Sequence, residues 1–327
     1  MFSFLLLFAT FTSATVVSTQ YDSGTLARFP IAFRVSHTNR TIPGIARIDL
    51  FRSNPILVAV EEIPRNSAWH EIDTIILENG IDQVAFDGEV SEPVNGTTSG
   101  FAAQIGASII SDFTTERLGF LTTPVSHDAG QLVISPQNAP QHAYGGVLFY
   151  SQNEHAAYWA VPIAVRMISS SSSGESAGTE MAADDLDFQT CTLHSIGRQM
   201  FLPREIVDDL LVEFERLGVV FSFARDYDGI MDVVLHHVTN VVIDSLPRMQ
   251  FLVRDQYHDQ VSIAVINPRE YLEDDPLNAS SKILLFKSRF GSSCTLGPLI
   301  LSKVVVHFDA QNHRVGFGEP LVDLEDF

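Results

Sequence analysis

The amino-acid sequence predicts a mostly-β protein with about two domains. The chain has 327 residues, of which 45% are hydrophobic and 18% are charged. That length is ample to bury a core, since globular domains usually hold roughly 100–200 residues each. Short apolar or alternating runs broken by Gly, Pro, Asn and Asp fill most of the chain, a pattern typical of β-sandwiches and barrels. We expect strands at residues 45–50, 56–60, 73–77, 146–150, 160–168, 219–223 and 303–308.

One segment follows a helical rather than a strand-like pattern. Between Pro203 and Leu217, apolar residues recur three or four positions apart, which is the spacing of one helix face. Pro203 suits the first helical position, and Gly218 suits the stop after the last turn. The sequence therefore predicts a helix over residues 203–217.

The first residues are consistent with a secretory signal. Phe2 to Phe11 are almost all apolar, and Thr12, Ser13 and Ala14 are small, which predicts a signal peptide over residues 1–14 cleaved after Ala14. The alternative is a buried first strand. No later run approaches the ~20 apolar residues that a membrane span needs, so we expect no membrane span after cleavage.

Three sequons and two cysteines fit an extracellular or endomembrane-lumen location. The sequons make Asn39, Asn95 and Asn278 candidate glycosylation sites. Cys191 and Cys294 permit one disulfide, which would close a loop of about 100 residues and stabilise by ~4–5 kcal/mol. From their spacing alone, two buried free thiols are equally compatible with the sequence.

The charge balance limits the range of partners. Asp and Glu number 40 against 20 Lys and Arg, a formal net charge of −20. Such a charge repels phosphate backbones and anionic membrane surfaces, so we expect no nucleic-acid partner. No Cys/His cluster has zinc spacing and no Gly-rich loop suits a phosphate, so we expect neither a metal nor a cofactor.

A Ser/Gly-rich stretch marks the expected boundary between two lobes. Five serines begin at Ser169, and small and acidic residues continue to Asp187. This composition cannot bury enough apolar surface to offset the cost of ordering. We therefore expect an N-terminal β lobe over residues 15–168, a flexible linker or loop over 169–187, and a C-terminal β lobe over 188–327.

Three pieces of the C-terminal third carry a family resemblance. Residues 242–253 read VIDSLPRMQFLV, residues 268–271 read PREY, and residues 294–319 read CTLGPLILSKVVVHFDAQNHRVGFGE. In this order and spacing they resemble the Ser-Leu-Pro turn, the Pro-x-x-Tyr element and the closing block of pepsin-type aspartic peptidases. The match extends over roughly residues 27–320, with weaker pieces at 73–92 and 117–124 and the pair Tyr158-Trp159. The resemblance implies a two-lobed pepsin-like fold, here with a shortened first lobe and flap.

The chemistry of that family needs two facing aspartates, each in an Asp-Thr/Ser-Gly turn. The two carboxyl groups share one proton, because like charges ~3 Å apart cannot both ionise cheaply. On the resemblance, Asp49 stands at the first catalytic position, but Leu50 and Phe51 replace the hydroxyl residue and the Gly.

At the second position, nine residues before Pro203, stands His194, followed by Ser195 and Ile196. An imidazole cannot share a proton with Asp49 as a carboxylic acid does. A tolerated polar residue at a decayed site is one interpretation of His194, and general acid–base work with Asp49 is the other.

The family's flap also has no clear counterpart. Only the twelve residues 61–72 lie between Val60 and Asp73, and they contain neither Tyr nor Gly. Trp69 is the aromatic residue available there, and packing on the first lobe is the alternative to a covering role. The resemblance also places the strand before His194 beside the strand before Gly297, which brings Cys191 and Cys294 toward each other.

These observations favour a secreted, catalytically inactive peptidase homologue that binds a protein, peptide or glycan or acts as an inhibitor. One alternative is a residual acid aspartic-type endopeptidase that uses Asp49. Another is a structural or storage glycoprotein without a ligand in its cleft.

Overall fold

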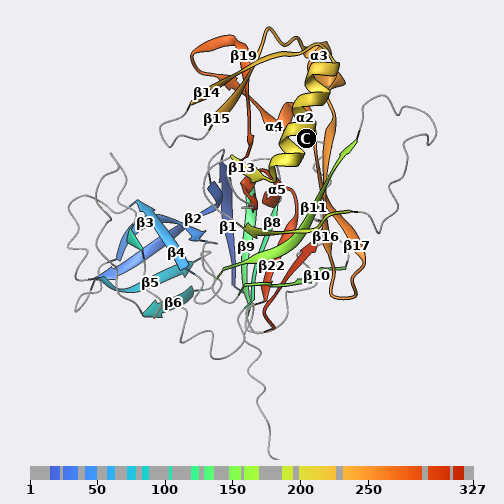
Figure 1. The fold of residues 1–327 in the computed structure, drawn as a ribbon. Coiled ribbons are helices and arrows are strands. Elements are labelled where there is room, and N and C mark those ends of the chain that lie inside the picture. The colour runs from blue at the N-terminus through green and yellow to red at the C-terminus, as the bar shows by residue number, and fades with distance from the viewer. Residues whose placement is uncertain are drawn as a thin grey trace, which may run out of the picture.

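The fold is seen in a computed structural model of the chain (Figure 1). For the first part of the chain the structure describes the backbone of nine strands. It describes further residues at 147–155, 158–168, 186–193, 199–225, 231–288, 294–309 and 312–319. The predicted signal peptide, residues 1–14, and most of the expected linker lie outside the described residues.

A 12-stranded sheet contains the N-terminal strands and two strands from the C-terminus. Its order is β10-β23-β22-β8-β9-β1-β2-β3-β4-β7, with β5 paired to β2 and β6 paired to β5. The strands are β1 (Thr15–Asp22), β2 (Thr25–Val35), β3 (Thr41–Asp49), β4 (Leu57–Glu62), β5 (Ile72–Glu78), β6 (Gln83–Asp87), β7 (Ala103–Gln104), β8 (Gly119–Pro124), β9 (Ala129–Ser135), β10 (Phe149–Gln152), β22 (Val305–Asp309) and β23 (Arg314–Gly318).

Three smaller sheets complete the described fold. A five-stranded sheet has the order β17-β16-β11-β12-β21, a four-stranded sheet the order β14-β15-β19-β18, and β13 pairs with β20. Their bounds are β11 (Ala160–Ile168), β12 (Gln189–Leu193), β13 (Met200–Leu202), β14 (Val220–Arg225), β15 (Met231–His236), β16 (Arg248–Arg254), β17 (Gln260–Ile266), β18 (Leu272–Asp275), β19 (Asn278–Leu284), β20 (Phe286–Ser288) and β21 (Cys294–Leu296).

Helix α2 (Arg204–Arg216) confirms the helix expected from the apolar spacing. Its buried residues Val207, Leu210 and Phe214 form one stripe, and burying each such side chain stabilises by about 1.5–3 kcal/mol. Gly218 follows with a φ of 76°, the left-handed conformation in which a helix commonly ends on Gly. Three shorter helices are α3 (Asn240–Ser245), α4 (Pro268–Tyr271) and α5 (Pro298–Leu301). None of the described helices is long and apolar enough to cross a membrane.

The described strands include all seven predicted segments, with small shifts that have local causes. The strand expected at 303–308 begins at Val305 because Lys303 N still donates to Ile300 O in the turn that closes α5. The strand expected at 146–150 begins at Phe149, where pairing with Phe317 starts.

The main core gathers residues of the five-stranded sheet, helix α2 and the C-terminal strands. Its largest fully buried apolar side chains are Trp159, Tyr271, Phe214, Phe251, Phe286, Phe308 and Phe317. The Tyr271 hydroxyl donates to Pro247 O at 2.8 Å. This bond joins the Pro-x-x-Tyr element to the Ser-Leu-Pro turn. From the sequence, only the family resemblance associates these two motifs.

Among the described strands, hydrogen bonding crosses the expected lobe boundary at three strands of the N-terminal part. Strand β11 pairs with β12 and β16, β8 pairs with β22, and β10 pairs with β23. The chain therefore links its two expected lobes through shared sheets. The limits at 168 and 188 remain a prediction.

Candidate functional site

The first expected catalytic position lies at the end of a strand. Asp49 is the last residue of β3, where it pairs with Leu57 of β4. The turn that would follow, residues 50–56, lies outside the described residues. Within the expected flap segment, residues 63–71, which include Trp69, also lie outside the described residues.

The second expected position follows β12. This strand lies between β11 and β21 and pairs with β21 in parallel, with Leu193 opposite Leu296. Leu193 N also donates to Trp159 O at 2.7 Å. The strand pairing that the resemblance implied is therefore present. His194 is the next residue along the chain and itself lies outside the described residues.

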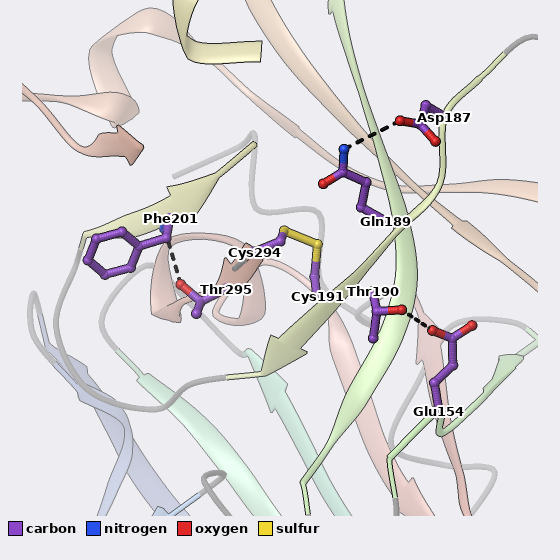
Figure 2. Close-up of a disulfide and its surroundings, with 8 residues drawn as sticks. All are labelled: Glu154, Asp187, Gln189, Thr190, Cys191, Phe201, Cys294 and Thr295. Atoms are coloured by element: carbon purple, nitrogen blue, oxygen red, sulfur yellow. Dashed lines mark hydrogen bonds between the residues drawn. A yellow bond between two sulfur atoms is a disulfide. The ribbon is translucent and has the colours of Figure 1, made fainter. Parts of the chain in front are cut away.

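A disulfide joins the two strands that lead to this position. Cys191 and Cys294 are bonded and are direct cross-strand partners, with their Cα atoms 4.4 Å apart (Figure 2). Both residues are buried. The disulfide prediction is confirmed, and the alternative of two free thiols is wrong.

Polar contacts surround the disulfide on both sides (Figure 2). Phe201 N donates to Thr295 Oγ1 at 3.1 Å, which joins β13 to β21. The Thr190 hydroxyl donates to the Glu154 carboxylate, which joins β12 to the segment after β10. The strand pair that precedes the second position is therefore held both covalently and by hydrogen bonds.

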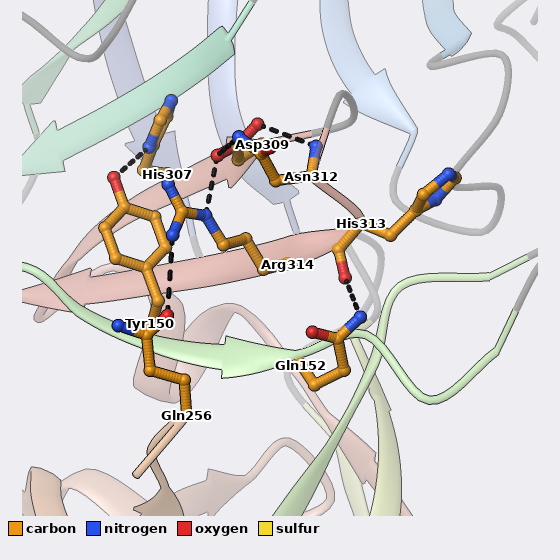
Figure 3. A network of polar contacts seen from close by, with 8 residues as sticks. All are labelled: Tyr150, Gln152, Gln256, His307, Asp309, Asn312, His313 and Arg314. Atoms are coloured by element: carbon orange, nitrogen blue, oxygen red, sulfur yellow. Dashed lines mark hydrogen bonds and ion pairs between the residues drawn. The ribbon is translucent and has the colours of Figure 1, made fainter.

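A second polar cluster lies on β10, β22 and β23 (Figure 3). The Tyr150 hydroxyl and His307 Nδ1 are 2.8 Å apart, and the Arg314 guanidinium lies 3.9 Å from the Tyr150 ring centroid. Arg314 Nε donates to Asp309 Oδ2 at 2.7 Å. The Tyr150 ring covers Gly316, where an added Cβ would meet the ring at 2.8 Å. Gly316 thus leaves the space that the Tyr150 ring occupies in this cluster.

Burial sets the charge state of this cluster. Burial lowers the pKa of His307 to about 4; Asp309 opposes this shift and Arg314 adds to it. Burial alone would raise the pKa of Asp309, but hydrogen bonds from Asn312 and Arg314 outweigh it and hold that pKa below its ordinary value. At neutral pH the cluster therefore holds a neutral imidazole beside an ionised carboxylate paired with Arg314.

This cluster was not predicted from the sequence because its members are far apart in the chain. Tyr150 and His307 are separated by 157 residues. The one local signal is the spacing of Asp309, Asn312 and Arg314 across the turn between β22 and β23, where Asn312 also donates to Asp309. His307 and Asp309 are buried, and the contacts of the cluster join β10 to the C-terminal hairpin.

Of the three sequons, the structure describes Asn278. It is the exposed first residue of β19, and its side-chain oxygen accepts from Ser280 N and Ser280 Oγ. Asn39 and Asn95 lie outside the described residues. Within the described part of the chain, no group of three His, Cys, Asp or Glu side chains is placed to hold a metal ion.

Comparison with known proteins identifies the fold. No protein-family model matches the sequence, and no curated protein matches it. Among solved structures, the crystal structure of an aspartic proteinase from Irpex lacteus matches with a TM-score of 0.52 and 13% identity. The match covers 94% of this chain and 98% of that one. The chain therefore has the mostly-β, two-lobed fold of the pepsin-like proteinases.

Proposed function

We propose that the protein is a secreted pepsin-like protein that binds a protein, peptide or glycan and does not cleave it. The observation that carries this proposal is the register of β12 against β21. With Cys191 opposite Cys294, β12 ends at Leu193, and the next residue in the sequence is His194, which the family resemblance assigns to the second catalytic position.

The chemistry of the two positions supports a non-catalytic role. An acid proteinase needs one carboxyl group as base and a second one that stays protonated beside it. His194 supplies no second carboxyl group, and Ile196 replaces the Gly of its turn. At the first position, Leu50 and Phe51 add side chains where the turn around Asp49 needs a hydroxyl and a Gly.

Two features support a secreted protein. The Cys191–Cys294 disulfide is the kind of bond that persists in oxidising compartments. Asn278 lies exposed in a sequon. The predicted signal peptide over residues 1–14 agrees with both.

Incubation of the purified full chain with denatured haemoglobin tests the loss of catalysis, with pepsin as the positive control. We expect no cleavage between about pH 3 and 5, the range in which a carboxyl dyad holds one proton. Circular dichroism at each pH confirms that the chain is still folded. Cleavage that an Asp49→Ala change abolishes would contradict the proposal and favour the residual endopeptidase.

Immobilised pepstatin tests binding in the same range of pH. Its central hydroxyl needs paired carboxyl groups, so we expect at least a 100-fold weaker interaction than with pepsin, about 3 kcal/mol. Peptide recognition that survives in the cleft would appear as weak binding that both Asp49→Ala and His194→Ala reduce. Binding as tight as that of pepsin would refute the decayed dyad.

A further inference from the structure

A chain of hydrogen bonds crosses the four-stranded sheet, away from both expected catalytic positions. Ser222 Oγ lies 2.7 Å from His236 Nε2. On the other side of the ring, His236 Nδ1 lies 3.3 Å from Ser281 Oγ. Asn278 Nδ2 donates to the same Ser281 oxygen at 2.9 Å. This series of hydrogen bonds thus connects β14, β15 and β19.

The strand register places these side chains on one face of the sheet. His236 is the cross-strand partner of both Val220 and Ser281, and Ser222 lies two residues beyond Val220. Because successive side chains alternate between faces, Ser222, His236 and Ser281 point the same way. Leu235, one residue before His236, is fully buried in the core, so the three polar side chains lie on the outer face.

The exposure of the three hydrogen-bonded side chains decreases from β14 to β19. Ser222 is exposed, His236 is half-buried, and Ser281 is 1% exposed. Strand β14 is one of the two edge strands of its sheet among the described strands (Figure 1). The Ser222 hydroxyl is therefore open to a ligand, and the histidine beside it is held by the buried Ser281.

Hydrogen-bond chemistry assigns a role to each member. A serine oxygen has two lone pairs, so Ser281 can accept from both Asn278 Nδ2 and His236 Nδ1. In that tautomer His236 carries its proton on Nδ1, and Nε2 presents a lone pair to the Ser222 hydroxyl. A hydroxyl bonded to a base that a third group orients is the arrangement of an activated nucleophile.

The neighbouring side chains on this face are apolar. Val220 is 64% exposed, Val234 is the cross-strand partner of Ser222, and Ile283 is the partner of Val234. Val234 and Ile283 are half-buried. A small apolar surface therefore borders the hydroxyl, and it suits the hydrocarbon part of an ester better than a charged substrate.

We propose that Ser222 is a nucleophile that accepts acyl groups from apolar esters, with His236 as its general base and Ser281 as the positioning residue. Ser222 Oγ bonds to the ester carbonyl carbon while its proton moves to His236 Nε2. The bond from that carbon to the ester oxygen then breaks, and the departing oxygen takes the proton from His236. Water releases the acyl group by the same route, which gives a carboxylic acid and restores Ser222.

A fluorophosphonate probe tests the nucleophile directly on the full-length protein. The Ser222 oxygen bonds to phosphorus, fluoride leaves, and the serine proton is lost through His236. We expect one probe per chain, located on Ser222 by peptide mass spectrometry. We expect Ser222→Ala to remain folded and to take up no probe.

Two matched pairs of variants separate the roles. His236→Asn should slow labelling by about 100-fold or more, the usual contribution of a general base, whereas His237→Asn, one residue further along, should leave it unchanged. Ser281→Ala should slow labelling, whereas Ser281→Thr, which keeps a hydroxyl beside His236 Nδ1, should restore the rate. Ser262, an exposed serine bonded to Gln250 and not to a histidine, is the reference hydroxyl.

Hydrolysis of an aryl ester of a short fatty acid gives a second readout in the same variants. We expect slow release of the phenol that depends on both Ser222 and His236. The proposal is overturned if Ser222 is labelled no faster than Ser262, or if His236→Asn leaves the rate unchanged. Neither assay involves Asp49 or His194, so its result is independent of the proposed peptide-binding role.

Discussion

Removal of the Cys191–Cys294 disulfide should destabilise the protein by several kcal/mol. The bond joins residues 103 positions apart in the sequence, so in the unfolded chain it closes a long loop. The loop-entropy relation for that length gives a stabilisation of about 4–5 kcal/mol. That is a large fraction of the roughly 5–15 kcal/mol that stabilises a typical folded protein.

Urea denaturation followed by circular dichroism measures this effect in three proteins. Oxidised and reduced wild-type chains contain the same heavy atoms, so the difference between their free energies of unfolding reports the cross-link alone. A Cys191→Ala/Cys294→Ala double variant also loses two buried sulfur atoms, and we expect about 1 kcal/mol or more of further loss. A difference below about 1 kcal/mol between oxidised and reduced wild type would refute the loop-entropy reasoning.

Two further predictions concern single side chains. His307 has a pKa of about 4 in the folded protein against an ordinary value of 6.5, so the unfolded chain binds the extra proton between these values, and stability falls as pH drops from about 6.5 to 4 by up to about 3 kcal/mol. His307→Gln, which keeps a partner for Tyr150, should remove that part of the pH dependence in urea titrations at several pH values; an unchanged slope would contradict the prediction. Tyr271→Phe leaves the buried Pro247 carbonyl without its donor and should cost about 1–3 kcal/mol, whereas Tyr257→Phe, at a residue 74% exposed, should cost nothing measurable by the same titration.

Local sequence patterns predicted the elements of the fold well. Helix α2 was predicted because its buried positions Val207, Leu210 and Phe214 share one helical face. The strand over residues 160–168 was predicted with its observed bounds, since a long apolar run there has few alternatives. The family resemblance supplied what local pattern cannot, the pairing of β12 with β21 and thus of Cys191 with Cys294.

Neither local sequence patterns nor the family resemblance could predict the polar clusters, because each cluster depends on the register between strands that are distant in the sequence. Tyr150 meets His307 only because β10 and β22 both pair with β23 in one sheet. Asn278 was interpreted from its sequon alone, and nothing near it in the sequence indicates that its amide reaches a serine bonded to His236. A shift of one residue between β15 and β19 would place His236 and Ser281 on opposite faces.

The position of the C-terminal hairpin constrains when the protein can fold. Val306 of β22 pairs with Thr122 of β8, 184 residues earlier (306 minus 122). During synthesis, β8 leaves the ribosome long before its partner exists, so one of its edges stays without that strand until β22 has been made. Such long-range pairing slows folding and leaves partly made sheets open to wrong partners. Completion of the large sheet therefore depends on the segment from Val305 to Gly318, which supplies β22 and β23.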